Sequence, residues 1–593
     1  MLQAAATLAL LATATLAWAL ITVDLSLAYV AETTSRATPW PYRLAALWGG
    51  MDGSMLFYAA MTAAVAVVAF RRRSPDLAMR VAAGTTGALL AFTVVFANPF
   101  TELPIPAVDG TGLLAILQHP AMIYHPPLLY LGLTTLVVPF SLTIGRVLSH
   151  EPALASGPVH RWLVLSWTLL TVGMVAGSSW AYVELGWGGF WAWDPVENTA
   201  LMPWLAITAF LHTSRVTRRD RRLARTTAIL AMVPFALGVL GIYLTRSGVT
   251  GSIHAFAEDP VIGRILLVAA LMVGIGVIVL GWRASPGLPW GAVEGRRDSW
   301  LAGNSILILA ALVFVVIGSA YPAYAEVFFA EEVAIDSTFF VVTVYPVAIL
   351  VVAGLALALR THWNLPGPTW REVMGFAALA IAFASAAALV GPTGAWPAAP
   401  GVGVAMAALG MLVYQLVRGR GSELVAHLAH IGLALVMLGA AGSALGGEFS
   451  GTMRPGESVE VSGHAVALES ISTGEADRFA YARAVFVIDG VTRVEPEIRG
   501  YEEQAAPVAE PALWSRPAGD VIVAISLLFP DANAVEVNVF VRPLVWLVWL
   551  GSLVTAAAGL LSLAGRGGAG EAPRQPARVE RLEGETARGM SAR

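Results

Sequence analysis

The chain has 593 residues, of which 57% are hydrophobic and 13% are charged, with a formal net charge of −4 and a mean hydropathy of +0.70. An average soluble domain carries about twice that share of charged residues, so the composition excludes a soluble protein and indicates a polytopic membrane protein. The sequence contains no cysteine and no lysine, which excludes disulfides, thiolate metal sites, a thiol nucleophile, a lysine Schiff base and a Walker-type loop.

Apolar runs of about 20 residues, the length that crosses a bilayer, recur along the chain and predict about fourteen membrane helices. The first run is too long for the apolar core of a signal peptide, so we expect a retained helix. The predicted helices cover 4–28, 44–69, 78–97, 122–145, 160–180, 198–215, 225–245, 260–282, 299–320, 338–359, 371–391, 398–417, 424–444 and 541–565. Residues 1–444 are thus expected to form an all-α bundle, followed later by one last helix.

Arginines fall in alternate connecting loops, as the positive-inside rule requires of the cytoplasmic loops of a membrane protein. These loops contain residues 71–73, 146, 215–225, 283 with 296 and 297, 360 with 371, and 418 with 420. The other loops, including 98–120, 181–197 and 246–259, carry little basic charge and are expected on the periplasmic face. The pattern predicts a multi-pass protein of the bacterial inner (cytoplasmic) membrane with both termini in the cytoplasm.

The insert 445–540 differs in composition from the predicted helices around it. Residues 457–462 and 482–488 alternate as strands do, a turn is expected at Asp489-Gly490, and 520–525 is a candidate buried strand. We expect a small β-rich periplasmic domain here, before the last helix. The Gly-, Arg- and Glu-rich tail 566–593 is predicted to be disordered and cytoplasmic.

The stretch 187–198, WGGFWAWDPVEN, is too rich in polar and small residues to span a membrane. A cluster of tryptophans at the lipid–water boundary is the ordinary interpretation, but three of them interleaved with glycine favour a platform for a flat apolar cofactor. Asp194-Pro195 is typical of a helix start. The residues expected to contact the cofactor here are Trp187, Gly188, Gly189, Trp191 and Trp193.

Two histidines in predicted membrane helices lie at similar depth. His212 is near the cytoplasmic end of its helix, and His430 is about two turns after the start of a helix that runs the opposite way. Imidazoles from two helices can bind one haem iron from its two faces, and a histidine inside a membrane is by default a functional residue. Each could instead donate to a carbonyl across a helix contact, and His427 is an alternative to His430.

A second pair of histidines is expected on the periplasmic face, at the level of the tryptophans. His125 opens the helix that begins HPPLLY, and His254 follows TRSGVTGSI. Together with the tryptophans they could hold a second haem. His119 is an alternative to His125. Zinc is a weaker interpretation of either pair because no closely spaced His/carboxylate set is present. Arg246 could pair with a haem propionate or simply anchor its helix at the interface.

These residues resemble those of the CcmF family, haem lyases of cytochrome c maturation system I. The stretch 187–204 (WGGFWAWDPVENTALMPW) resembles the WWD motif of haem-handling proteins, and support comes from HPPLLY at 125–130, TRSGVTGSIHAF at 245–256 and AHIGLA at 429–434. The resemblance extends over nearly the whole chain. Phe190 stands where many members have tryptophan.

The resemblance implies that His125 and His254 hold a substrate haem, and that His212 and His430 hold a resident b-type haem. It implies as partners a haem chaperone of the CcmE type, CcmH- and CcmI-type subunits and an apocytochrome c with a Cys-X-X-Cys-His motif, and it implies quinol as a reductant. The catalytic residues are then His125, His254, Trp187, Trp191, Trp193 and Asp194.

The predicted function is therefore a haem lyase that promotes thioether attachment of haem to apocytochrome c. A haem transporter without lyase activity, in which the inner histidines are a waypoint, is the alternative. A quinol-oxidising membrane cytochrome is a third possibility, although electron transfer alone needs no open tryptophan platform. No nucleic-acid partner is expected.

Overall fold

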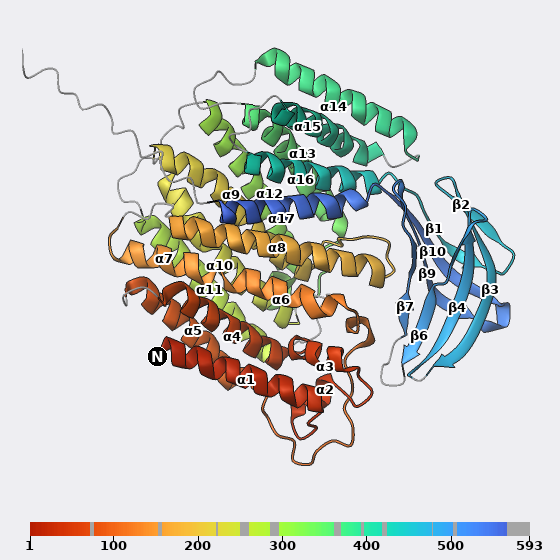
Figure 1. Cartoon of the computed structure of the whole chain (residues 1–593), viewed down its shortest axis with the longest axis horizontal. Helices are drawn as coiled ribbons and strands as arrows, with labels where there is room; N and C mark the ends of the chain where they lie inside the picture. Colours follow the sequence, from red (N-terminus) through yellow and green to blue (C-terminus); the bar gives the residue numbers. More distant parts are fainter. Residues whose placement is uncertain are drawn as a thin grey trace, which may run out of the picture.

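The computed structural model describes residues 1–71, 76–151, 157–220, 223–248, 260–284, 296–360, 369–392, 396–417, 424–476, 478–501 and 507–565. Long helices run side by side to form a bundle, and a β-rich domain covers one end of it (Figure 1). The chain begins at the other end of the bundle, which we call the opposite end. The end with the β-rich domain and the opposite end serve as the reference for the position of each predicted site.

Seventeen α-helices are present in the described part of the chain. They are α1 (Leu2–Thr22), α2 (Ala28–Thr33), α3 (Trp40–Ala45), α4 (Met51–Phe70), α5 (Leu77–Phe96), α6 (Ala121–Thr134), α7 (Val137–Leu148), α8 (Gly157–Glu184), α9 (Pro195–Asp220), α10 (Ala224–Arg246), α11 (Pro260–Arg283), α12 (Arg296–Phe329), α13 (Ser337–Arg360), α14 (Trp370–Val390), α15 (Ala399–Val417), α16 (Leu424–Ser443) and α17 (Trp546–Ala564).

Thirteen of the described spans are long and apolar enough to cross a membrane. The fourteenth predicted span, 198–215, is helix α9, which the same measure of length and hydropathy does not include. Two predicted helices differ in detail from the observed ones. The span 122–145 consists of α6 and α7, with a break between them, and the first helix ends at Thr22 and not at residue 28.

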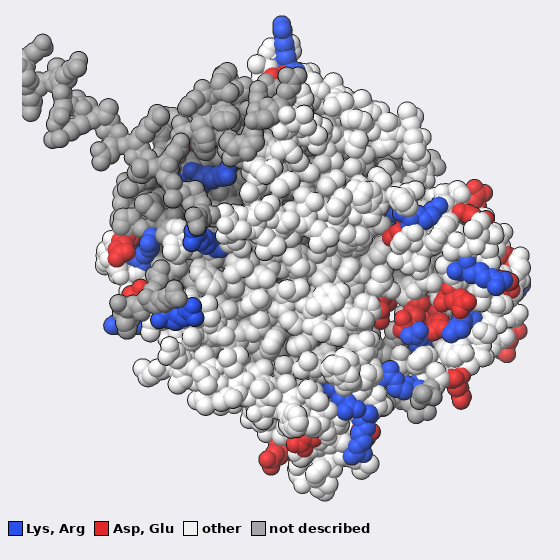
Figure 2. All heavy atoms as spheres, in the orientation of Figure 1, with Lys and Arg blue, Asp and Glu red and all other residues white. Residues whose placement is uncertain are grey.

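Charged side chains are scarce over the middle of the bundle, where Figure 2 shows a wide uncharged band between two charged margins. The exposed side chains of the long helices are largely apolar, such as those of α11 (Val268, Leu271, Met272, Ile275 and Ile278). Water would disfavour such a surface, whereas lipid accommodates it. The chain is a multi-pass membrane protein.

The β-rich domain lies between α16 and α17, in the predicted insert. One sheet has the order β1-β10-β9-β8 and the other β2-β3-β4-β6-β7, with β5 paired to β4. The strands are β1 (Glu448–Met453), β2 (Ser458–Val461), β3 (His464–Ala476), β4 (Phe479–Ile488), β5 (Thr492–Val494), β6 (Glu497–Tyr501), β7 (Val508–Glu510), β8 (Ala512–Trp514), β9 (Gly519–Phe529) and β10 (Ala534–Pro543). We call this unit the β-domain.

Local sequence explains why these strands form. Residues of β4 alternate between buried and half-buried positions, and Val521, Val523 and Ile525 of β9 lie in the core shared by the two sheets. The predicted turn at Asp489-Gly490 is present, with positive φ at both residues, and it joins β4 to β5 as an antiparallel hairpin. Positive φ at both central residues is the geometry that suits the twist of a tight hairpin.

The β-domain is attached to the bundle by more than its two flanking helices. The Tyr182 hydroxyl of α8 donates to the Asp520 carboxylate at 3.0 Å, and burial raises the pKa of that carboxyl. Arg478, between β3 and β4, donates to the Ala37 carbonyl at 3.2 Å and to the Gln118 side chain at 3.1 Å. These contacts fix the β-domain over the end of the bundle where α6 and α9 begin.

Candidate functional site

His212 and His430 meet inside the bundle. Their ring centroids are 6.1 Å apart, with 44° between the ring planes, and both side chains are half-buried. His212 lies far along α9 and His430 near the start of α16, at the depth predicted from the opposite directions of the two helices. We call these two residues the bundle site.

The separation of the two rings fits ligation of one metal ion between them. A metal–nitrogen bond of about 2 Å on each side places the centroids of two imidazoles about 6 Å apart. Nδ1 of His212 donates to the Thr208 carbonyl at 2.7 Å, so in the neutral ring the lone pair is on Nε2. A metal-binding histidine usually has its orientation fixed in this way, by a hydrogen bond from the ring nitrogen that does not bind the metal.

The alternative residue His427 lies one turn before His430 on α16. Its side chain is fully buried, at 2% exposure, whereas the ring that contacts His212 is that of His430. The contact favours His430 as the partner of His212. Ligation of iron by either residue stays a prediction.

His125 lies in the first turns of α6, at the β-domain end of the bundle. Its Nδ1 donates to the Gly173 carbonyl of α8 at 2.8 Å, which again leaves the lone pair of the neutral ring on Nε2. The alternative, His119, uses its Nδ1 as an acceptor for the Ala121 amide at 3.1 Å, and so caps the start of α6. Burial lowers the pKa of His119, which keeps this ring neutral.

The loop 185–194 is held against the β-domain. A β-carbon on Gly188, whose φ is +69°, would overlap the Phe540 ring of β10, and Arg542 Nε donates to the Gly188 carbonyl at 2.6 Å. Gly189 is covered in the same way by the Trp187 ring. Protein rings therefore occupy the Cβ side of Gly188 and of Gly189, and contact of either glycine with a flat ligand stays a prediction.

Trp191 and Trp193 do not lie in one plane, and contact of the three tryptophans with a flat cofactor stays a prediction. Trp191 and Trp193 are nearly perpendicular, at 86°, with centroids 6.2 Å apart, the edge-to-face geometry that aromatic quadrupoles favour. One face of Trp193 is stacked on Phe340 of α13 at 5.0 Å and 2°. Trp187 instead packs against a core cluster to which Ala121 and Met122 of α6 belong.

Two of these indoles have no acceptor for their N–H groups. Nε1 of Trp187 and Nε1 of Trp191 are buried and lack a hydrogen-bond partner among the described residues. A buried donor without a partner costs about 1–3 kcal/mol, and such a cost is often retained where a ligand supplies the acceptor. We call His125, Trp187 and Trp191 the rim site.

Asp194 is the N-cap of α9. Its carboxylate accepts from the Val196 amide at 2.7 Å, while Glu197 accepts from the amides of Ala192 and Asp194. This is the reciprocal arrangement of a capping box, with Pro195 at the first helical position. Asn198 donates to the Trp193 carbonyl and to Ser319 of α12, both at 3.0 Å. Asp194 therefore shapes the loop, and its catalytic role stays a prediction.

Arg246 ends α10 and is half-buried. Its Nη2 donates to the Tyr130 hydroxyl on α6 at 3.0 Å, and within the described residues no carboxylate pairs with it. Arg246 thus lies beside the helix of His125, and its contact with a haem propionate stays a prediction. His254 belongs to the segment 249–259, which lies outside the described residues, so its predicted pairing with His125 is untested.

Known proteins are similar to this chain over most of its length. A family model described as Cytochrome C assembly protein matches residues 48–252. The chain is 32% identical to the cytochrome c-type biogenesis protein CycK of Bradyrhizobium diazoefficiens (91% of this chain and 86% of that protein), and 31% and 32% identical to CcmF of Pseudomonas fluorescens (92% and 87%) and of Escherichia coli (91% and 88%). The chain belongs to the CcmF family of cytochrome c-type biogenesis proteins.

The fold of this CcmF-family chain is also found in a solved structure. A cytochrome c heme lyase CcmF matches it with a TM-score of 0.76 and 24% sequence identity, over 94% of this chain and 90% of that one. At this identity the match establishes the fold.

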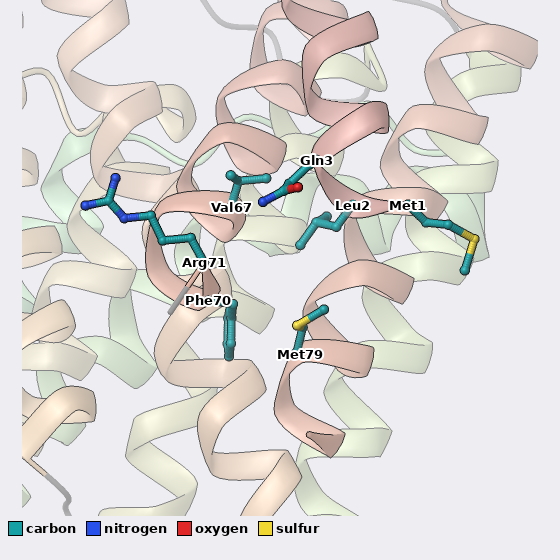
Figure 3. A pocket seen from close by; sticks show the side chains of 7 residues that line it. All are labelled: Met1, Leu2, Gln3, Val67, Phe70, Arg71 and Met79. Carbon is teal, nitrogen blue, oxygen red and sulfur yellow. The ribbon is translucent and has the colours of Figure 1, made fainter. Parts of the chain in front are cut away.

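A further hollow lies at the opposite end of the bundle of this CcmF-family protein. It is lined by Met1, Leu2, Gln3, Val67, Phe70, Arg71 and Met79 (Figure 3). The side chains are mostly apolar, with a single charge, so we assign it no chemistry. In the described part of the chain no group of three or more His, Asp or Glu side chains could hold a metal ion, which leaves the zinc alternative without support.

Several residues that shape the CcmF-family rim site were not predicted from the sequence. Phe540 and Arg542 come from the β-domain and Phe340 from α13, more than 140 residues from the loop that they contact. Gly173 and Gly177 of α8 are also absent from the predictions. Only Asn198 carried a local signal, because Asp-Pro-x-Glu-Asn is typical of a capped helix start.

Proposed function

We propose that this protein is a haem lyase that receives haem at the rim site and promotes its covalent attachment to apocytochrome c. The observation that carries the proposal is the presence of two histidine sites at different depths. One lies between helices α9 and α16 within the bundle, and the other lies at the end of the bundle that the β-domain covers and includes indole donors without acceptors among the described residues. The family and the lyase name of the solved relative support it.

The rim site is proposed to face the periplasm. The helix ends and loops with clustered arginines, including Arg71, Arg146, Arg215 and Arg283, lie at the opposite end of the bundle from the β-domain. By the positive-inside rule that end is cytoplasmic. Both ends of the chain are then cytoplasmic, since α1 begins and α17 ends there, and the membrane is the bacterial inner membrane.

The reaction adds two cysteine thiols of the apocytochrome to the two vinyl groups of the substrate haem. In each addition a sulfur–carbon bond forms, the thiol hydrogen ends on the other vinyl carbon, and no oxidant is consumed. The lyase therefore needs no nucleophile of its own, which is consistent with its lack of cysteine. Its contribution is to position the haem and to control the iron through axial ligands and burial.

The residues of the rim site can be given separate tasks. His125, with Nδ1 held by a carbonyl, presents the lone pair of Nε2 to the iron. The indole N–H groups of Trp187 and Trp191, and the guanidinium of Arg246, can donate to the propionates. His254 is proposed as the second axial ligand, which the histidine of the apocytochrome would replace.

The bundle site fits a resident b-type haem held by His212 and His430. Such a group would supply one electron at a time, and quinol is the proposed donor that keeps the substrate iron ferrous. We propose as partners a periplasmic haem chaperone of the CcmE type, CcmH- and CcmI-type subunits and the apocytochrome.

The test is a reduced-minus-oxidised spectrum of the purified protein, with haem quantified, for the wild type and for His125→Ala, His212→Ala and His430→Ala. We expect His125→Ala to lose the rim haem and thioether formation while the bundle haem spectrum is kept. The other two variants should lose the bundle haem. If haem is lost from both sites or from neither in His125→Ala, the two-site proposal is wrong. A bundle haem absent from purified wild type would favour a transporter in which His212 and His430 are a waypoint.

A further inference from the structure

We propose that Gly173 and Gly177 of α8 are positioning residues for His125, fixing the direction of its Nε2 before haem arrives. The inference rests on the proposed function, because it assumes that His125 is the axial ligand of the rim site. It assigns to two glycines a role in ligand geometry in addition to helix packing.

The carbonyl of Gly173 sets the tautomer of the His125 ring. A carbonyl oxygen only accepts, so the 2.8 Å contact requires that Nδ1 of His125 carries the hydrogen. The neutral ring then has its lone pair on Nε2. This carbonyl accepts from the imidazole although it lies inside a long helix, where its oxygen has a second lone pair available.

Gly177, one turn further along α8, allows the His125 ring to lie close to that helix. A β-carbon at this position would lie 2.8 Å from Nε2 and 2.9 Å from Nδ1 of His125, and closer still to the carbon between them. Contacts shorter than 3 Å would force a shift of the ring, whose Nδ1 is bonded to the Gly173 carbonyl of the same helix. The imidazole of His125 therefore lies against the backbone of α8 at a position that only glycine allows.

The helix of His125 is itself held at this point. Pro126 has no amide hydrogen to donate to the Met122 carbonyl four residues earlier, and Trp48 Nε1 donates to that carbonyl instead at 2.8 Å. On the other side, Leu129 of α6 packs against Gly173 so closely that a β-carbon there would lie 3.1 Å from the Leu129 amide nitrogen. Backbone and ring of His125 are thus both fixed, which preorganises the ligand.

The test compares Gly177→Ala with Gly132→Ala in the full-length purified protein. Gly132 is a glycine of α6 in the same α6–α8 contact, where a β-carbon would press on Leu170 and not on His125. The measurements are haem content, the axial-ligand signature of the rim haem by resonance Raman or electron paramagnetic resonance, and rescue by added imidazole. The bundle haem spectrum reports whether the variant is folded.

We expect Gly177→Ala to weaken rim haem binding by about 10- to 100-fold, the usual effect of disturbing a residue that orients a metal ligand. Its ligand signature should change, and added imidazole should restore it in part. Gly132→Ala should keep the wild-type ligand signature. Both variants should keep the bundle haem.

Two outcomes overturn the inference and are distinguishable from failure of the proposed function. If Gly177→Ala keeps the wild-type ligand signature while His125→Ala loses the rim haem, the positioning role is wrong and the lyase proposal stands. If both glycine variants lose rim haem equally, the effect is one of helix packing. If His125→Ala itself keeps the rim haem, the proposed function has failed.

Discussion

The bundle site and the rim site use the same side chain in two kinds of surroundings. At the bundle site, two imidazoles from regular helices face each other at 6.1 Å with no loop between them. At the rim site, His125 is held by glycines of α8, and the nearby tryptophans are on a loop that the β-domain covers. The first arrangement is suited to retaining a group, and the second to exchanging one.

The two sites differ in which contacts hold their side chains in position. The bundle site depends on helix packing alone, so its geometry should be insensitive to changes in the β-domain. The rim site depends on contacts between segments far apart in the sequence. Substitutions that affect only one of the two sites therefore test this comparison.

Replacing the two histidines of α16 by alanine, one at a time, should give the largest difference between variants. We expect His430→Ala to abolish binding of the bundle haem because it removes the ring that faces His212, whereas His427→Ala should retain the haem with a shifted spectrum at most. A reduced-minus-oxidised spectrum with haem quantified per protein measures both. Loss of the haem in His427→Ala with retention in His430→Ala would reverse the assignment.

Gly188→Ala should disrupt the rim site and leave the bundle site intact. The change places a β-carbon where the Phe540 ring lies and adds about 1–2 kcal/mol for a left-handed backbone. Gly186→Ala is the matched control, since Gly186 also has a φ of +69° but a β-carbon there would lie 3.5 Å or more from its neighbours. Thioether formation should fall much further in Gly188→Ala than in Gly186→Ala. Equal losses would mean that backbone strain alone is responsible.

Arg542→Gln should weaken the same contact more mildly. It removes a charged donor from the Gly188 carbonyl, a hydrogen bond of a class worth about 1.5–3 kcal/mol. Hydrogen exchange of 185–194 should become faster, with a moderate loss of thioether formation. Arg454→Gln, at an exposed position of the β-domain, should change neither quantity. If exchange in the loop is the same in both variants, the β-domain does not stabilise the loop through this bond.

The smallest effect concerns His464, a histidine of the β-domain that we assign to neither site. Its Nδ1 donates to Asp489 at 2.7 Å, and this hydrogen bond holds the pKa of the Asp489 carboxyl below its usual range. The depressed pKa stabilises the folded β-domain at neutral pH, and this contribution is lost as the pH falls below the ordinary value of about 3.8.

Asp489→Asn should accordingly destabilise the β-domain by less than about 1 kcal/mol near neutral pH, as for an exposed pair, and reduce the dependence of its stability on pH in that acid range. Chemical unfolding monitored by tryptophan fluorescence at neutral and acid pH measures this. An unchanged acid dependence would show that the pair is not coupled to folding.

Local pattern accounts for most of what the sequence predicted correctly. Apolar runs and turn residues located the membrane helices, the strands of the β-domain and the Asp489-Gly490 turn. Depth along two antiparallel helices placed His212 level with His430, although it left His427 as an alternative that only the ring contact distinguishes. Each of these depends on neighbours in the sequence or on the regular rise of a helix.

The rim site was predicted less well because its geometry depends on long-range contacts. Nothing near Gly188 indicates that Phe540 covers it, and composition does not show that Trp191 and Trp193 would be perpendicular. Asp194 carried the signal of a helix start, which the capping box confirms, while its catalytic assignment stays a prediction. The partner predicted for His125, His254, lies outside the described residues.

The attachment of β10 to the tryptophan loop has a consequence for how the protein is made. Phe540 and Arg542 precede α17 by only a few residues, so they leave the ribosome after nearly all of the other membrane helices. The loop at 185–194 must wait for them before it reaches its final shape. The bundle site, completed by α16, can form earlier in synthesis than the rim site.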